Sequence, residues 1–125
     1  MSGYSFDSNI IIDALVGRPP ARVEIDRARR GGRIWISRMA WIEVLSKGEP
    51  DDLAAARAFM TGFRIDEIDA ESAERAAALR RERKRLRSAD AIILASAQVR
   101  GRILVTRNVK DFPASMPGIR VPYTL

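Results

Sequence analysis

Three acidic residues lie in apolar surroundings along this chain. Asp90 directly precedes residues 91–99, which carry no charge, and Asp7 and Glu43 stand beside similar apolar segments. An ionised carboxylate next to so much apolar surface is costly unless a cation meets it. The three acids are therefore candidate ligands of a metal ion. For Glu43 a solvent-facing position is equally compatible with the pattern, because neighbouring helical positions differ by about 100°.

The composition excludes several kinds of catalytic site. The 125 residues include no histidine and no cysteine. This excludes Ser-His-Asp and Cys-His catalysis, zinc sites made of imidazole or thiolate groups, and disulfides. Hydrolytic chemistry would have to use carboxylates, hydroxyls, lysine or a bound hard cation. Oxygen ligands without histidine suit Mg²⁺, with Mn²⁺ as a substitute.

The chain is basic, with a formal charge of +6 and a pI near 10.7, so a polyanionic partner such as nucleic acid is expected. The charge is densest in a run that ends three residues before Asp90. Its basic residues are Arg80, Arg81, Arg83, Lys84, Arg85 and Arg87. Such a run is usually a solvated helix face. Beside a catalytic Asp90, it would instead bind an RNA backbone through sequence-independent phosphate contacts.

Apolar patterning divides the chain into alternating strands and helices. It predicts strands at 4–6, 33–36, 64–68, 102–105 and 119–121. It predicts helices at 10–15, 21–30, 38–45, 50–60, 71–85 and 88–100, with Ser37 and Ser88 as N-terminal caps and Gly101 ending the last helix. Pro19 and Pro20 are expected to break the chain before the second helix, in which Val23 faces the core and Glu24 the solvent.

This alternation predicts an α/β fold with a mainly parallel central sheet of about five short strands, covered by helices. The carboxyl ends of parallel strands meet at one edge of such a sheet. We expect Asp7 and Asn108 to reach this edge from strands, and Glu43 and Asp90 from the beginnings of two helices. Asp13 follows Asp7 by six residues, about 600° around a helix, so it need not face the same site.

Four segments resemble the sequence blocks of PIN-domain ribonucleases. They are FDSNIIIDAL at 6–15, SRMAWIEVL at 37–45, SADAIILASA at 88–97 and ILVTRNVKDF at 103–112. Their order and spacing agree over essentially the full length, and the chain is most similar to VapC-type toxins of prokaryotic toxin–antitoxin modules. The resemblance implies one PIN-like nuclease domain over residues 1–125.

The resemblance also implies a Mg²⁺-dependent endoribonuclease, in which a metal-activated water hydrolyses RNA phosphodiester bonds. It identifies Asp7 and Asp90 as direct metal ligands. Glu43 would hold the metal directly or through water and orient the attacking water. The fourth catalytic position is Asn108, where family members often have Asp, so a second metal ion would be held more weakly. Asp111 is a candidate for the missing charge, or else a cap of its own turn.

Three further residues near these acids could support the metal ligands through hydrogen bonds. They are Ser8, Asn9 and Thr106, and each could equally satisfy a local turn. As partners, the resemblance implies a cognate VapB-type antitoxin, an RNA substrate such as transfer RNA or another structured RNA, and a second copy in a homodimer. No stretch reads as a membrane span or signal peptide, so a cytoplasmic location is expected.

Two other functions compete with this one. A catalytically degenerate PIN-fold module that binds RNA or protein is favoured by the neutral Asn108 and by the basic run. Phosphoryl transfer to aspartate draws slight support from Asp7, Thr106 and Lys110, but the DSN sequence at 7–9 lacks the second aspartate of the phosphatases, and no glycine motif for nucleotide phosphates is present.

Overall fold

In the computed structural model, which describes residues 3–125, five strands form one sheet in the order β3-β2-β1-β4-β5, and every neighbouring pair is parallel. The strands are β1 (Tyr4–Phe6), β2 (Ile34–Ser37), β3 (Arg64–Asp66), β4 (Ile103–Val105) and β5 (Ile119–Arg120). The predicted α/β fold with a parallel sheet is confirmed. Since β1 lies between β2 and β4, residues that follow these three strands share one edge of the sheet.

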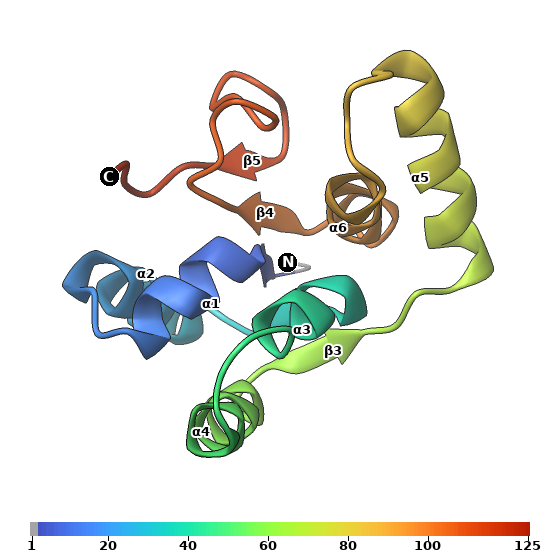
Figure 1. Cartoon of the computed structure of the whole chain (residues 1–125). Helices are drawn as coiled ribbons and strands as arrows, with labels where there is room; N and C mark the ends of the chain where they lie inside the picture. The colour runs from blue at the N-terminus through green and yellow to red at the C-terminus, as the bar shows by residue number, and fades with distance from the viewer. Residues whose placement is uncertain (1–2) are drawn as a thin grey trace.

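Six helices pack around the sheet in the described part of the chain. They are α1 (Ser8–Leu15), α2 (Pro19–Arg30), α3 (Arg38–Val44), α4 (Pro50–Met60), α5 (Ala70–Glu82) and α6 (Ser88–Val99). Figure 1 shows α1 beside α2 at one end of the molecule and α5 beside α6 at the other. The sheet therefore stands between two pairs of packed helices.

Local sequence explains most helix ends. Ser37 accepts a hydrogen bond of 3.0 Å from the Ala40 amide, which confirms it as the cap of α3. Gly101 has φ 65°, a conformation that glycine adopts without steric cost, and it follows α6 as predicted. Pro19 and Pro20 open α2 instead of preceding it, because the first turn of a helix needs no amide donor.

Besides small shifts at other element ends, four details differ from the sequence prediction. The cap of α6 is Arg87, not Ser88, which is the first helical residue. Helix α5 ends at Glu82, three residues earlier than predicted, and β3 ends at Asp66, two earlier. In α2, Val23 is 66% exposed and Glu24 is buried, the opposite of the prediction for these two residues, whereas Ile25 and Ala28 do face the core. Glu24 can be buried because the guanidinium groups of Arg27 and Arg120 both bind it.

The core lies between the sheet and the helices. Its largest fully buried apolar side chains include Phe6, Ile10, Ile36, Ile93, Leu104 and Phe112. Three of the four sequence blocks contribute to this set, and the block at 37–45 adds the smaller buried side chains of Ala40 and Val44. All four blocks therefore pack into one core. Phe63 meets Phe6 edge-on with ring centroids 5.8 Å apart, which makes it a core residue.

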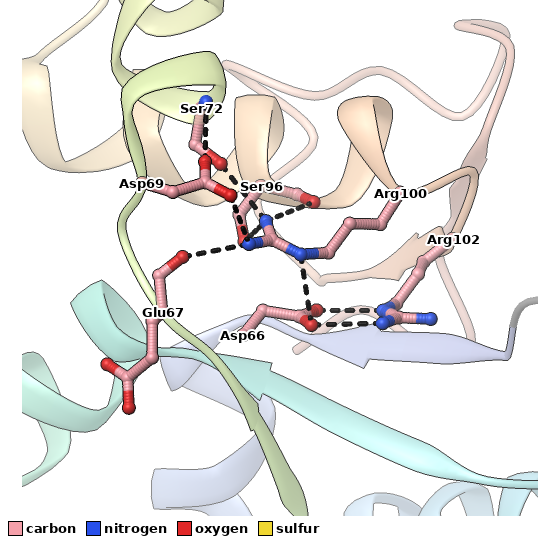
Figure 2. Close-up of polar contacts among 7 residues, drawn as sticks. All are labelled: Asp66, Glu67, Asp69, Ser72, Ser96, Arg100 and Arg102. Carbon is pink, nitrogen blue, oxygen red and sulfur yellow. Dashed lines mark hydrogen bonds and ion pairs between the residues drawn. The ribbon is translucent and has the colours of Figure 1, made fainter.

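Arg100, just after α6, joins three elements at one point (Figure 2). Its guanidinium contacts the Asp66 carboxylate, the main-chain carbonyl of Glu67, and the side chains of Asp69, Ser72 and Ser96. Asp66 is buried and also accepts two hydrogen bonds, of 2.7 and 2.9 Å, from Arg102. This network ties the end of β3 and the beginning of α5 to the end of α6, the helix that carries Asp90.

No helix among residues 3–125 has the length and apolar character needed to cross a membrane.

Candidate active site

Asp7 lies where the ends of β1 and β4 meet. Its backbone amide donates to the carbonyl of Val105 (2.9 Å), and its extended backbone makes it the N-terminal cap of α1. One carboxylate oxygen, Oδ1, accepts from the amide of Ser8 (2.7 Å). The other, Oδ2, accepts from the Thr106 hydroxyl (2.8 Å) and from the Asn9 side chain (3.3 Å). Ser8, Asn9 and Thr106 thus hold the Asp7 carboxylate in one orientation.

Burial makes ionisation of the Asp7 carboxylate energetically unfavourable. The side chain is 3% exposed, and burial raises its pKa from the ordinary 3.8 to about 6. Hydrogen bonds from Thr106 and Ser8 oppose this rise, whereas the carboxylates of Glu43 and Asp90 add to it. Glu43 and Asp90 therefore lie near enough to act electrostatically on Asp7, although the three acids come from different elements.

Glu43 reaches the site from α3. Its Oε1 accepts a hydrogen bond of 2.8 Å from the hydroxyl of Ser8, and its side chain is half-buried. The same Ser8 binds Asp7 through its amide. One residue therefore connects two of the candidate acids, and the solvent-facing alternative for Glu43 does not apply.

Asp90 reaches the site from the first turn of α6 and is 3% exposed. Its Oδ2 accepts a hydrogen bond of 3.0 Å from Nε of Arg87, one helical turn earlier. An acid in the first turn is also stabilised by the helix macrodipole. The carboxylate is therefore buried but paired, unlike that of Asp7.

Asn108 and Asp111 form a closed turn beyond β4. The backbone N–H of Asn108 donates a hydrogen bond to the Thr106 hydroxyl (3.0 Å), which places the turn next to Asp7. The Asn108 side chain donates to Asp111 Oδ2 (3.0 Å) and accepts from the Asp111 amide (3.3 Å). Asn108 thus orders its own turn and holds the Asp111 carboxylate near the site.

The basic run does not form a single helix face. Arg80 and Arg81 end α5, while Arg83 to Arg87 belong to the loop between α5 and α6. Within this loop Arg83 donates to the main-chain carbonyl of Asp111, and Arg87 to Asp90. The side chain of Arg80 donates a hydrogen bond to the main-chain carbonyl of Leu86 (3.0 Å), whereas Lys84 and Arg85 are exposed. The loop therefore passes directly beside the candidate acids.

Asp13 belongs to a separate cluster. It is buried, and it accepts two hydrogen bonds from Arg107 (2.6 and 3.0 Å) and one from Tyr123 (2.7 Å). Burial alone would raise the pKa of Asp13, but the hydrogen bonds of Arg107 and Tyr123 outweigh it and hold the pKa below its usual value. Asp13 is compensated by protein groups and has no need of a metal ion.

Two supporting residues were missed by the sequence analysis. Arg107 fixes the backbone between Thr106 and Asn108 through its ion pair with Asp13, and its amide donates to Asn9 (3.4 Å). The sequence predicts Arg87 only as a contact for RNA phosphate, yet it pairs with Asp90. The available signal was its position, three residues before Asp90, where helical geometry places two side chains on one face.

The donor set suits a hard divalent cation. It offers carboxylate, amide and hydroxyl oxygens, and the pKa of Asp7 is raised, first by burial and to a smaller extent by the neighbouring carboxylates of Glu43 and Asp90. Among the described residues no three acidic side chains lie close enough to hold one ion together. It stays a prediction that Asp7 and Asp90 would hold Mg²⁺ or Mn²⁺ directly and that Glu43 would hold the ion directly or through water.

Comparisons with known proteins agree with this fold. The PIN domain family matches residues 4–114. A search of curated proteins found no match. Among solved structures, a chain of a toxin–antitoxin complex from Klebsiella pneumoniae is 38% identical, with a TM-score of 0.87, and the match covers 98% of this chain and 99% of that one.

Two structures described as VapBC are also similar. A chain of DNA-bound VapBC from Salmonella typhimurium is 25% identical over 96% of both chains, with a TM-score of 0.81. A chain of VapBC2 from Rickettsia felis, bound to a promoter DNA fragment, shares the fold, with 21% identity over 93% of this chain and 94% of that one and a TM-score of 0.79. The predicted resemblance to VapC-type PIN domains is confirmed, and the chain belongs to the PIN-domain family.

Proposed function

We propose that this protein is the toxin of a VapBC-type module and that it hydrolyses RNA phosphodiester bonds with the help of Mg²⁺. The observation that carries the proposal is the Asp7 carboxylate. It is buried at the carboxyl edge of the sheet, its charge is incompletely compensated, and it shares this edge with Glu43 and Asp90. In a basic PIN domain, these groups suit a cation that in turn meets a phosphate.

Each side chain then has a defined task. A bound divalent ion supplies Lewis acidity toward water and the phosphate. Asp7 and Asp90 hold the ion, and Thr106 and Ser8 keep the Asp7 oxygens in place. Glu43 Oε1 is occupied by the Ser8 hydroxyl, so Oε2 is the atom that accepts the proton of the attacking water. Exposed basic residues near α6 bind the RNA backbone.

The antitoxin partner is supported by an apolar groove of about 420 Å³ beside the candidate site. Residues from α1, α3 and α4 line it, among them Ile12, Leu15, Val16, Val44, Ala55 and Ala56, together with Glu43. Val16 is 67% exposed and Ile12 40%. An amphipathic segment laid in this groove would bury both and block access to Glu43. The Klebsiella structure that resembles this chain is itself a toxin–antitoxin complex.

A homodimer is supported by a second apolar depression, of about 460 Å³, between α5 and α6. Ile68, Ala73, Ala77 and Ile92 contribute to it. Light scattering on the isolated protein should give twice the mass of the chain, and Ala77→Arg, at an exposed position of α5, should shift the mass to that of a monomer. The cytoplasm is the expected compartment, because RNA and antitoxin would be met there.

Titration calorimetry with Mn²⁺ and Mg²⁺ tests the proposal most directly. The parent, Asp7→Asn, Asp90→Asn and the exposed control Asp51→Asn would be compared, and mixed transfer RNA would then be added to each. We expect metal binding and chelator-sensitive cleavage by the parent and the control, with cleavage reduced more than about a hundredfold in the two site variants. Unchanged cleavage in both site variants would contradict the proposal.

A binding module without catalysis is the second candidate, because the Asn108 amide is neutral and already bonded to Asp111. This function predicts RNA binding that weakens with salt but is insensitive to chelator, and no cleavage product at any metal concentration. The same calorimetry and cleavage samples distinguish it from the ribonuclease.

A further inference from the structure

Arg87 places a positive charge at the exposed side of a buried carboxylate. Its Nε lies 3.0 Å from Oδ2 of Asp90, and the side chain of Arg87 is 72% exposed while that of Asp90 is 5% exposed. Arg87 is also the N-terminal cap residue of α6, with an extended backbone (φ −68°, ψ 153°). The guanidinium therefore contacts Asp90 from the solvent side and is not packed inside the protein.

The guanidinium faces acids from more than one element. The pKa of Arg87 is raised, first by its hydrogen bond to Asp90, and the carboxylates of Glu43 and Asp111 act in the same direction. Glu43 lies on α3 and Asp111 in the turn after β4. Arg87 therefore lies near Asp90, Glu43 and Asp111 together.

Other members of the basic run are placed differently. Arg80 and Arg83 donate to main-chain carbonyls, and Arg85 is exposed and forms no ion pair with the described residues. Within the run, therefore, it is Arg87 that pairs with a candidate metal ligand. Arg85, two residues away in the same loop, provides a matched control.

A metal ion and Arg87 compete for the same carboxylate. Asp90 Oδ2 accepts from the guanidinium, and a cation bound at this oxygen would be repelled by the arginine charge. The guanidinium of Arg87 is open to water, which screens its attraction to Asp90, so a divalent ion can displace the arginine. The displaced guanidinium stays attached one helical turn from Asp90, where its planar fork matches two oxygens of a phosphate.

We propose that Arg87 is a displaceable counter-ion of the metal site: it neutralises Asp90 before the ion binds and then binds the phosphate of RNA after the ion has taken its place. The inference rests on the proposed function and deepens it, because it assigns Arg87 a positioning role toward both ion and substrate. Since the ion frees a phosphate-binding group, ion and RNA bind cooperatively, and each increases the affinity of the other by the same factor.

Calorimetric titration with Mn²⁺ in the absence of RNA tests the first step. Arg87→Met removes the competing charge and keeps a long side chain, so its Mn²⁺ affinity should rise roughly twofold to fivefold. Arg87→Lys should remain close to the parent, and Arg85→Met should be unchanged. Circular dichroism would verify that each variant is folded. An equal Mn²⁺ affinity of parent and Arg87→Met would overturn the inference.

Fluorescence anisotropy with a labelled mixed-sequence RNA tests the second step, with phosphorothioate linkages to slow hydrolysis. Adding Mn²⁺ should raise the RNA affinity of the parent more than that of Arg87→Met, whereas Arg85→Met should lose the same factor with and without Mn²⁺. An equal metal effect in parent and Arg87→Met would overturn the assignment of phosphate binding to Arg87.

The two proposals fail in different ways. If the parent binds Mn²⁺ and cleaves RNA but Arg87→Met shows the same affinities and metal effect, only the inference on Arg87 falls. If neither protein binds Mn²⁺ and the parent does not cleave RNA, the ribonuclease function itself falls, and the role of Arg87 falls with it.

Discussion

The hydroxyl of Thr106 donates a hydrogen bond of 2.8 Å to Oδ2 of Asp7, which lies ninety-nine positions earlier in the chain. Both residues are buried. Each directly follows a strand, Asp7 after β1 and Thr106 after β4, and these strands pair with Phe6 opposite Val105. The bond exists because two parallel neighbours end at the same level. It orients the acid whose charge is least compensated.

Thr106→Val should therefore weaken metal binding without disturbing the fold. Valine has nearly the same shape but cannot donate to Asp7, so the carboxylate loses a partner that orients it. We expect metal affinity and RNA cleavage to fall by about tenfold to a hundredfold. Calorimetry and a cleavage assay measure both. Thr61→Val, at an exposed position after α4, is the control and should behave as the parent.

Asp7→Asn should stabilise the protein in the presence of a chelator. Asp7 is buried and its pKa is raised to about 6, so keeping it ionised at pH 7.5 costs folding free energy. Removing the charge should raise the free energy of unfolding by about 1–3 kcal/mol. Urea denaturation in EDTA measures this gain. Mn²⁺ should then stabilise the parent but not the variant, because the variant lacks a ligand.

Glu24 should make the stability depend on pH in the acidic range. Burial alone would raise its pKa, but hydrogen bonds and charges of Arg27 and Arg120 outweigh it and lower the pKa from 4.5 to about 2. Because the pKa is lower in the folded state, this stabilisation is complete above pH 4.5 and disappears as the pH falls toward 2.

Glu24→Gln should accordingly lower the free energy of unfolding by about 1–3 kcal/mol at pH 7. The difference from the parent should shrink steadily between pH 4.5 and pH 2. Urea denaturation at several pH values measures it. Glu74→Gln, at an exposed position of α5, should cost almost nothing at any pH. A pH-independent cost of Glu24→Gln would mean that side-chain packing, and not charge, stabilises this region.

Arg100→Met should destabilise the fold and reduce activity together. The variant leaves Asp66, Asp69 and Ser72 without a shared donor, and α6 loses its connection to β3 (Figure 2). We expect a loss of about 2–4 kcal/mol in unfolding free energy. Arg38→Met, which breaks the more exposed pair with Glu67, should cost less than about 1 kcal/mol. Similar costs for the two variants would contradict a special role of Arg100.

The local sequence was sufficient for the α/β class and for most elements. Strand and helix periodicities differ, and the four blocks all lie within residues 4–114, which the PIN domain family matches. Asp7 and Thr106 each follow a predicted strand, and the parallel pairing of these two strands is enough to make the residues neighbours. The errors lie where tertiary contacts decide. Glu24 is buried because Arg120, ninety-six residues later, binds it, and no local sequence pattern predicts this ion pair.

The sequence by itself determined which groups are available: carboxylates, amides, hydroxyls and many arginines, without histidine or cysteine. The tertiary structure decided how the charges pair. Asp13 and Asp66 are neutralised by arginines distant in the chain, and Asp7 receives only neutral donors, whereas the pair of Arg87 with Asp90 is local, three residues apart. The physical reason is that a buried carboxylate depends on every charge around it, and the neighbours that decide its state are brought together only when the sheet and helices assemble.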